Sequence, residues 1–250
     1  PRQPRRIKSQ KKKAAKKPKK RPTLPRAQRP PPEVTRDLFL VWRMPRLGMH
    51  NPQPMSNPAW CWLARQRELS AYMANAHFGG PSSMRVGPCW CASRFGQSET
   101  LLPDGRIIRI GGEHEDHYDP DFYIYNDVSV TAPSGEPEIY GYPHEVFPPT
   151  DFHSATLVGD RIVIIGCLGY PAQRVPTETP VFALDTRTLA ITRLATTGAL
   201  PGWIFEHQAE AAANGTSITI GGGKRVVHVE DNDQIRENHD DWSLDLERLT

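Results

Sequence analysis

One short segment of the chain gathers the residue types that hold metal ions or move protons. Residues 113–121 read Glu-His-Glu-Asp-His-Tyr-Asp-Pro-Asp. Two histidines three residues apart beside carboxylates resemble the donor set of two-histidine-one-carboxylate sites for divalent transition metals. The segment therefore suggests a metal or acid–base site. Its candidate ligands are His114, His117 and Asp116, with His228 or His239 from later in the chain available to complete the shell.

The same segment also fits an acidic surface loop without a metal. Asp119 and Asp121 are of a residue type that caps turns, and the segment lacks the helix that makes histidine metal motifs specific. A loop of this kind can instead contact a protein partner. On that interpretation the contacting residues are Glu113, His114, Asp116, His117, Tyr118 and Asp119.

Two other motifs contain residue types that can carry chemistry. Cys89-Trp90-Cys91, with Cys61 and His77 nearby in sequence, suggests zinc, but zinc pairs usually have two or more residues between the cysteines. Buried cysteines beside a tryptophan explain that motif as well. Residues 221–224, Gly-Gly-Gly-Lys, lack the spacing of a phosphate loop. The sequence therefore predicts no cofactor and no catalytic residue.

The chain that carries these motifs repeats itself about every 55 residues. Each copy begins with two short apolar-polar strands joined by a turn that contains glycine or aspartate, which is the pattern of a β-hairpin. The second strand of each hairpin ends at Gly111, Gly166 or Gly221. The predicted hairpins pair 97–102 with 107–112, 153–158 with 162–167, and 207–211 with 217–222.

Further strands follow each hairpin. Third strands are predicted at 122–130, 181–185 and 242–246, and fourth strands at 138–142 and 190–194. The third copy runs out of chain near Thr250 before a fourth strand. Four antiparallel strands in each copy make up a β-propeller blade.

The repeats resemble the kelch family. The resemblance rests on the glycine pairs Gly111-Gly112 and Gly221-Gly222, on the His-Ser-Ala run at 153–155, and on aromatic residues in the third strands, although Cys167 replaces one glycine. Those aromatic residues are Tyr123, Phe182 and Trp242. The resemblance implies an all-β fold of kelch-type propeller blades over residues 94–250, and a module that binds other proteins. The three blades are expected at 94–147, 148–200 and 201–250.

Three blades cannot close a ring, because propellers typically use four to eight. The fold is therefore expected to be a partial or incomplete ring with open strand edges. Residues 33–93, another chain or missing blades would cover those edges.

The connections after the second strands should emerge on one face, because every blade has the same topology. They span 113–121, 168–180 and 223–241 and are all long, which is typical of a binding face. Aromatic and basic residues in or beside them are of the type that anchors protein interfaces. They are Tyr170, Arg174, Trp203, Lys224, Arg225 and Arg236.

Residues 33–93 are predicted to form a linker with one helix over 57–76. Asn57 suits the N-cap, Pro58 the first helical position, and Gly79-Gly80 the stop. The apolar face of this helix is expected to pack on the blades. A strand is predicted at 37–42.

Residues 1–32 form a basic segment of different composition. They hold 14 of the 31 Lys and Arg residues and no acid, so the rest of the chain carries 17 basic and 28 acidic side chains. Basic runs broken by prolines, without apolar periodicity, are typical of disorder. The residues concerned are Lys11, Lys12, Lys13, Lys16, Lys17, Lys19, Lys20 and Arg21.

Three interpretations of this basic segment stand side by side: a nuclear localisation signal, an arm that binds nucleic-acid phosphates, and a solubilising extension. It has no aromatic residues between its charges, so binding to nucleic acid would not depend on base sequence. The segment could also fold back on the acidic body. The chain begins with Pro1 rather than Met, which fits a fragment or a processed product.

Four cysteines and no long apolar stretch predict a reduced intracellular protein, nuclear or otherwise cytoplasmic, without a membrane span. Three function classes follow. The first is a non-enzymatic kelch-type module that binds a protein partner through the long loops. The alternatives are a propeller-based enzyme with a site in 113–121, and a nucleic-acid-associated protein that acts through the basic segment.

Overall fold

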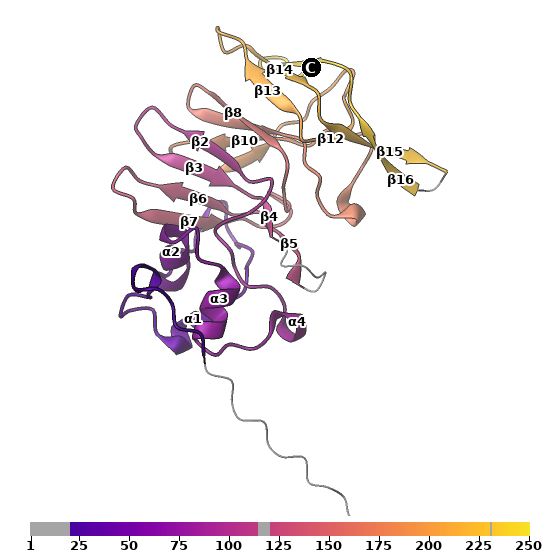
Figure 1. Ribbon diagram of the computed structural model, residues 1–250. Coiled ribbons are helices and arrows are strands. Elements are labelled where there is room, and N and C mark those ends of the chain that lie inside the picture. The colour runs from indigo at the N-terminus through magenta and orange to yellow at the C-terminus, as the bar shows by residue number, and fades with distance from the viewer. Residues whose placement is uncertain (1–20, 115–120, 231) are drawn as a thin grey trace, which may run out of the picture.

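The structure is a computed structural model in which residues 21–114, 121–230 and 232–250 are described. It consists mainly of antiparallel β-sheets, none of which is closed, with short helices gathered at the N-terminal end (Figure 1). The strands of the predicted repeats form three separate sheets, which we call the first, second and third units.

The first two units each contain four strands that neighbour one another in chain order. The first unit consists of β2 (Ser98–Leu101), β3 (Ile107–Ile110), β6 (Val128–Thr131) and β7 (Pro137–Gly141), and β1 (Gln53–Pro54) pairs with the outer edge of β7. The second unit consists of β8 (Ser154–Val158), β9 (Arg161–Ile165), β10 (Val181–Asp185) and β11 (Ile191–Arg193). The predicted hairpins and the third and fourth strands of both units are confirmed, apart from residues 122–127, which precede β6.

The third unit has three strands, β13 (Gln208–Ala211), β14 (Ser217–Gly221) and β17 (Trp242–Asp245). Residues 223–241, predicted to form a loop, instead contain the hairpin β15 (Lys224–Val229) and β16 (Asn232–Glu237). This hairpin pairs with β12 (Trp203–Phe205) to form a further sheet. Apolar residues at Val226 and Ile204 support that pairing, and both are buried. A small sheet joins β4 (Glu113–His114) to β5 (Tyr123–Ile124).

The helices of the described N-terminal part are α1 (Arg36–Trp42), α2 (Pro58–Arg65), α3 (Ala71–His77) and α4 (Ser83–Val86). A 3₁₀ turn, η1 (Arg26–Gln28), precedes them, and another, η3 (Pro171–Gln173), lies between β9 and β10. The strand predicted at 37–42 is wrong, because this segment is α1. Thr35 caps α1 by accepting the Leu38 N–H at 3.3 Å, and a short apolar run does not by itself distinguish a strand from a helix.

The single helix predicted over 57–76 is divided into α2 and α3. Asn57 Oδ1 accepts the Trp60 N–H at 2.9 Å and starts α2. That helix ends where Gln66 leaves helical geometry, with φ −108° and ψ 53°. Ser70 caps the new start by accepting the Tyr72 N–H at 3.2 Å. The predicted apolar face is therefore interrupted, and Met73 is exposed.

Residues 33–93 cover the outer side of the first unit. Helix α2 lies against β7, and Trp60, Trp62 and Leu63 of α2 share a buried cluster with Ile139 of β7. The side chain of Asn51 covers the edge of β11 by bonding to both backbone groups of Ile191, at 2.8 and 2.9 Å. Residues 33–93 therefore pair with the outer edge of β7 and cover the outer edge of β11 at Ile191.

The three units lie side by side with apolar faces between them. Ile108 and Ile110 of the first unit pack with Ile162 and Ile164 of the second. The opposite face of the second unit packs with the third through a separate cluster that includes Val163, Ile165, Ile218 and Ile220. The first strand of each unit, β2, β8 or β13, lies next to the first strand of the following unit.

Two contacts recur between successive units. The Phe152 N–H donates to the Gly96 carbonyl, and the Glu206 N–H donates to the Phe152 carbonyl, both at 2.8 Å. All three residues have positive φ. Directly after them, His153 Nε2 bonds to Ser98 Oγ and His207 Nε2 bonds to Ser154 Oγ, again at 2.8 Å. These contacts join the first strands of neighbouring units, and their repetition shows that both junctions are built in the same way.

The register of the third unit departs from the sequence repeat by one residue. Ser98 pairs with Ile110 and Ser154 with Ile165, each one residue before the glycine that ends the strand. Gln208, however, pairs with Gly221. The structural counterpart of Gly111 and Gly166 is therefore Gly222, and these three glycines have φ of +57°, +70° and +65°.

Within the three described ranges, no helix combines the length and the apolar character needed to cross a lipid bilayer.

Candidate functional site

The connections that follow the second strands approach one another at one end of the sheets. Figure 1 shows β4–β5 and β15–β16 on the same side, opposite the turn that joins β2 to β3. The connection 166–180 contacts both sides. The Ile124 N–H of β5 donates to the Tyr170 hydroxyl at 2.8 Å, and Trp203 of β12, which pairs with β15, donates to the Leu168 carbonyl at 3.0 Å. We call this end of the molecule the loop face.

A buried carboxyl group, Asp151, lies at the junction of the first two units on this face. Its Oδ1 accepts the Gly169 N–H at 2.7 Å, and its carbonyl accepts the Leu168 N–H at 3.1 Å. Burial raises the pKa of Asp151, while the Gly169 hydrogen bond, an interaction with Glu113 and the charge of Arg174 oppose that rise. Its second oxygen makes no close hydrogen bond to the described residues.

Three of the predicted interface anchors hold the backbone beside Asp151. Arg174 donates from Nε to the Leu168 carbonyl at 2.9 Å and from Nη2 to the Gly169 carbonyl at 3.0 Å. Trp203 Nε1 also donates to the Leu168 carbonyl, at 3.0 Å. Tyr170 accepts from Ile124, as described above. These side chains fix the loop through hydrogen bonds within the chain.

Beside this fixed loop lies a cavity of about 340 Å³. Its floor and walls are mostly apolar and buried, with Phe182, Trp203 and Cys167 among them. Burial raises the pKa of the Cys167 thiol above its ordinary range, and the nearby charge of Asp151 adds to this, so the thiol stays protonated. Polar side chains stand at the rim: His144, Glu145, Gln173, Glu178 and Arg193. Gln173 bonds to His144, and Arg193 pairs with Glu178 at 2.9 Å.

The other predicted anchors lie apart from this cavity. Lys224 pairs with Glu206 at 2.7 Å, and Arg225 lies 3.6 Å from Asp240. Arg236 donates to Gln234 at 3.2 Å. All three belong to the β15–β16 hairpin, so the structure divides the predicted anchors into two groups.

The acidic segment is only partly within the described residues. Asp116, His117, Tyr118 and Asp119 lie outside them. His114 stacks on the ring of Tyr72, with centroids 5.6 Å apart. His228, suggested as a further ligand, lies 3.2 Å from Asp233 on its own hairpin. Within the described ranges, no group of three or more His, Cys, Asp and Glu residues is arranged to hold a metal ion.

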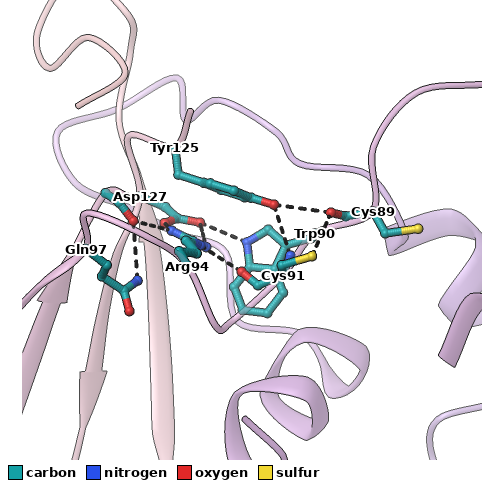
Figure 2. Close-up of polar contacts among 8 residues, drawn as sticks. Cys89, Trp90, Cys91, Arg94, Gln97, Tyr125 and Asp127 are labelled. Atoms are coloured by element: carbon teal, nitrogen blue, oxygen red, sulfur yellow. Dashed lines mark hydrogen bonds and ion pairs between the residues drawn. The ribbon is translucent and has the colours of Figure 1, made fainter. Parts of the chain in front are cut away.

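The Cys89-Trp90-Cys91 motif belongs to a buried polar network rather than to a cysteine cluster (Figure 2). Asp127 forms an ion pair with Arg94 and accepts from Trp90 Nε1 at 2.8 Å. Arg94 also lies 3.5 Å from the ring centre of Tyr125. Burial by itself would lower the pKa of Arg94, but the charge and hydrogen bonds of Asp127 raise it.

The rest of this network fixes the cysteine segment. The Cys91 N–H donates to the Tyr125 hydroxyl at 3.0 Å, and that hydroxyl donates to the Cys89 carbonyl at 3.2 Å. Cys61 instead lies near the Pro137 carbonyl, and His77 near the Pro22 carbonyl. The four residues suggested for zinc are therefore not brought together, and the network attaches residues 89–94 to the segment before β6.

Sequence reasoning missed two features: Asp151, and the two histidines at the unit junctions, His153 and His207. The signal for the histidines is visible, because His153 and His207 each stand directly before the first strand of a unit. Asp151 has no counterpart, since Phe205 occupies the matching position in the next repeat. A repeat pattern cannot identify a residue that occurs in only one copy.

Comparison with known proteins found no matching family model and no matching curated protein.

Proposed function

We propose that this chain is a protein-interaction module of the kelch propeller type, whose loop face binds a segment of a partner protein. The propeller relationship is supported by the equal strand order of the first two units and by the contacts that recur between units. These contacts place the first strand of every unit next to that of the following unit, which is how blades neighbour one another around a propeller axis.

The observation that carries the binding proposal is the preformed cavity on the loop face. Binding pockets for small groups are typically 300–1,000 Å³, mostly apolar, with a few polar groups around them. The cavity beside Trp203 has this size and this lining. Because Arg174 and Trp203 hold its walls by hydrogen bonds, little ordering is required on binding, which favours affinity. An apolar side chain of a partner segment fits the floor, and the rim can bond to the partner's backbone.

The enzyme alternative expected from the sequence has a metal or acid–base site in residues 113–121, of which 115–120 lie outside the described residues. The structure adds the Asp151 carboxyl group, which interacts with Glu113. Asp151 is fully buried, and its hydrogen bonds hold the loop at Leu168 and Gly169. A group that a substrate cannot reach does not act as an acid or base on it. We therefore assign Asp151 to positioning the loop face, and place the binding function first.

A peptide selection tests this proposal. A random peptide library would be selected on the full chain, and the affinity of the recovered peptides measured by fluorescence anisotropy. Val175→Lys places a charge at the exposed edge of the cavity and should weaken binding about fivefold or more, because loss of an important interface contact costs about 1 kcal/mol or more. Val41→Lys makes the same change on exposed α1 and should leave affinity unchanged.

Equal affinity for both variants would show that the selected peptides do not use the cavity. Failure to recover any peptide that binds the unchanged chain would contradict the proposed function itself.

A further inference from the structure

One face of the first unit carries a polar row of side chains where the other two units are apolar. Glu99 of β2 lies opposite Arg109 of β3, which in turn lies opposite Ser129 of β6. The counterparts of this row are Ala155, Ile164 and Phe182 in the second unit, and Ala209, Ile220 and Trp242 in the third. Both isoleucines are buried in the clusters between units. The polar row therefore differs in chemistry from the faces that pack one unit on another.

Helix α2 and the segment that follows it partly cover this row and leave a small pocket beside it. Ala64 of α2 lies on one side of the pocket, and strands β3 and β6 form the other. The polar side chains that line it are Arg67, Arg94, Gln97, Arg109, Ser129 and Thr131. Guanidinium and hydroxyl groups that converge on one space are donors for oxyanions such as carboxylate and phosphate.

A carboxylate of the chain itself occupies the position of such an anion. Glu99 Oε2 accepts from Arg109 Nε at 2.7 Å and from Arg67 Nη1 at 3.3 Å. Arg94 is already neutralised, because it forms the buried ion pair with Asp127 (Figure 2). One negative charge therefore faces two guanidinium groups, and one positive charge is left unbalanced.

Glu99 can leave the pocket while Arg109 stays in place. The Glu99 side chain is 51% exposed, whereas that of Arg109 is 12% exposed and donates from Nη1 to Thr131 Oγ1 at 2.9 Å. Ion pairs as exposed as that of Glu99 are weak, so rotation of its carboxylate into solvent costs little. With Glu99 in place the pocket has about 10 Å³ of free space, roughly enough for one water molecule. A larger anion therefore has to take the place of the Glu99 carboxylate.

We propose that this pocket binds a phosphate monoester carried on a side chain of a partner segment, with Arg67 and Arg109 as its ligands and Glu99 as the group it displaces. A phosphate monoester carries nearly two negative charges at pH 7 and three acceptor oxygens. It therefore balances both guanidinium groups, which the single charge of Glu99 does not. The partner as source of the phosphate rests on the proposed function, but the pocket shares no residue with the loop-face cavity.

A phosphopeptide titration tests this inference. A blocked peptide, Gly-phosphoserine-Gly, would be added to the full chain at constant ionic strength while the NMR signal of the Arg109 Nε–H group is followed. The signal should shift until the site is saturated. The matched peptide Gly-Asp-Gly should bind at least about fivefold more weakly, because its single charge leaves one guanidinium unbalanced. Inorganic phosphate, added in a separate titration, tests the same pocket with a free ion.

Two substitutions should change the affinity for the phosphopeptide in opposite directions. Arg67→Gln removes a half-exposed guanidinium and should weaken binding about tenfold or more, the effect of losing one hydrogen bond to a charged group. Glu99→Gln removes the competing carboxylate and should strengthen binding about two- to fivefold, since the ion pairs it breaks are weak. Arg65→Gln and Glu136→Gln each break the neighbouring Arg65–Glu136 pair and should change affinity by less than about twofold.

Weaker binding by Glu99→Gln, or equal losses in Arg67→Gln and Arg65→Gln, would overturn the proposal, because binding would then not depend on this pocket. Binding of inorganic phosphate without binding of the phosphopeptide would overturn it as well, since the pocket would then accept only a free ion. Val175→Lys should leave phosphopeptide affinity unchanged. The pocket and the loop-face cavity are therefore tested independently, and either proposal can fail without the other.

Discussion

The histidines at the two unit junctions, His153 and His207, show how a single side chain attaches one unit to the next. His153 and His207 are buried, and each uses Nε2 to reach a serine of the preceding unit while Nδ1 has no partner among the described residues. Burial lowers the pKa of His153 to about 3 and that of His207 to about 4. Both side chains are therefore neutral in the folded protein at pH 7.

These shifts make stability depend on pH. An unfolded histidine has a pKa near 6.5, so the unfolded chain binds more protons than the folded chain between about pH 6.5 and pH 4. Stability is fully present above that window and falls as the pH falls through it. From pH 7 to pH 5, we expect each histidine to contribute a loss of about 2 kcal/mol. Urea unfolding at the two pH values measures this loss.

Glutamine substitutions provide the comparison for the histidine effect. His153→Gln and His207→Gln keep an amide that can bond to serine but remove the titrating group, so each should reduce the difference in unfolding free energy between pH 7 and pH 5. His50→Gln changes an exposed histidine and should leave that difference as it is. An unchanged difference in the two buried variants would show that other groups dominate the pH dependence.

At the scale of elements, the strands were predictable and their exact register was not. Alternating apolar residues and glycine-containing turns place the hairpins correctly, because both signals are local. Gly221 and Gly222 are adjacent, and only the pairing of Gln208 with Gly221 shows that Gly222 takes the place of Gly111 and Gly166. The β15–β16 hairpin was missed because its strands are mostly polar; β16 is exposed throughout.

In the helical segment and at the loop face, too, the sequence predicts local features better than features that depend on the fold. Ser70 restarts a helix that a continuous apolar pattern would extend, and Thr35 starts one where an apolar run suggested a strand. Of the predicted site residues, Arg174, Tyr170 and Trp203 do come together. The sequence could not show that they bond to their own loop, because that depends on the position of Leu168 and Gly169 in the fold.

Two of the glycines that end the second strands, Gly111 and Gly166, are required by close backbone approach, whereas a Cβ at Gly222 would meet nothing within 4 Å. A Cβ at Gly166 would lie 2.2 Å from the Ile204 carbonyl, which accepts the Cys167 N–H, and φ is +70°. Gly135 has φ +86° but nothing within 4 Å. Gly135→Ala should cost about 1–2 kcal/mol from backbone conformation alone. Gly166→Ala should cost roughly 3 kcal/mol or more, because the junction between units must also shift.

Denaturant unfolding of both alanine variants separates the two effects. The dependence of the unfolding free energy on urea concentration should be the same for both variants, since neither changes the surface exposed on unfolding. Equal destabilisation of Gly135→Ala and Gly166→Ala would contradict the steric argument at the unit junction.

On the scale of the whole molecule, charge is separated along the chain. Residues 1–20 contain 11 Lys and Arg and no acid, whereas residues 21–250 contain 20 basic and 28 acidic side chains. The second part therefore repels nucleic-acid phosphates on average, and attraction has to come from the first. Residues 1–20 include no aromatic side chain on which a base could stack, so they are not expected to distinguish base sequences.

We predict that the full chain binds DNA through residues 1–20, weakly, without sequence preference and with strong dependence on salt. If 6–10 phosphates are contacted, affinity should fall by about 10³–10⁵ between 50 and 200 mM salt, because bound counterions are released. Fluorescence anisotropy with two unrelated duplexes of equal length measures this, and residues 21–250 serve as the control. Retained binding by that control, or a clear preference between the duplexes, would locate nucleic-acid recognition in the folded units. If residues 21–250 lose DNA binding but keep their peptide affinity at the loop-face cavity, the two parts of the molecule act separately. The acidic units would then make the protein contacts and the basic segment the phosphate contacts.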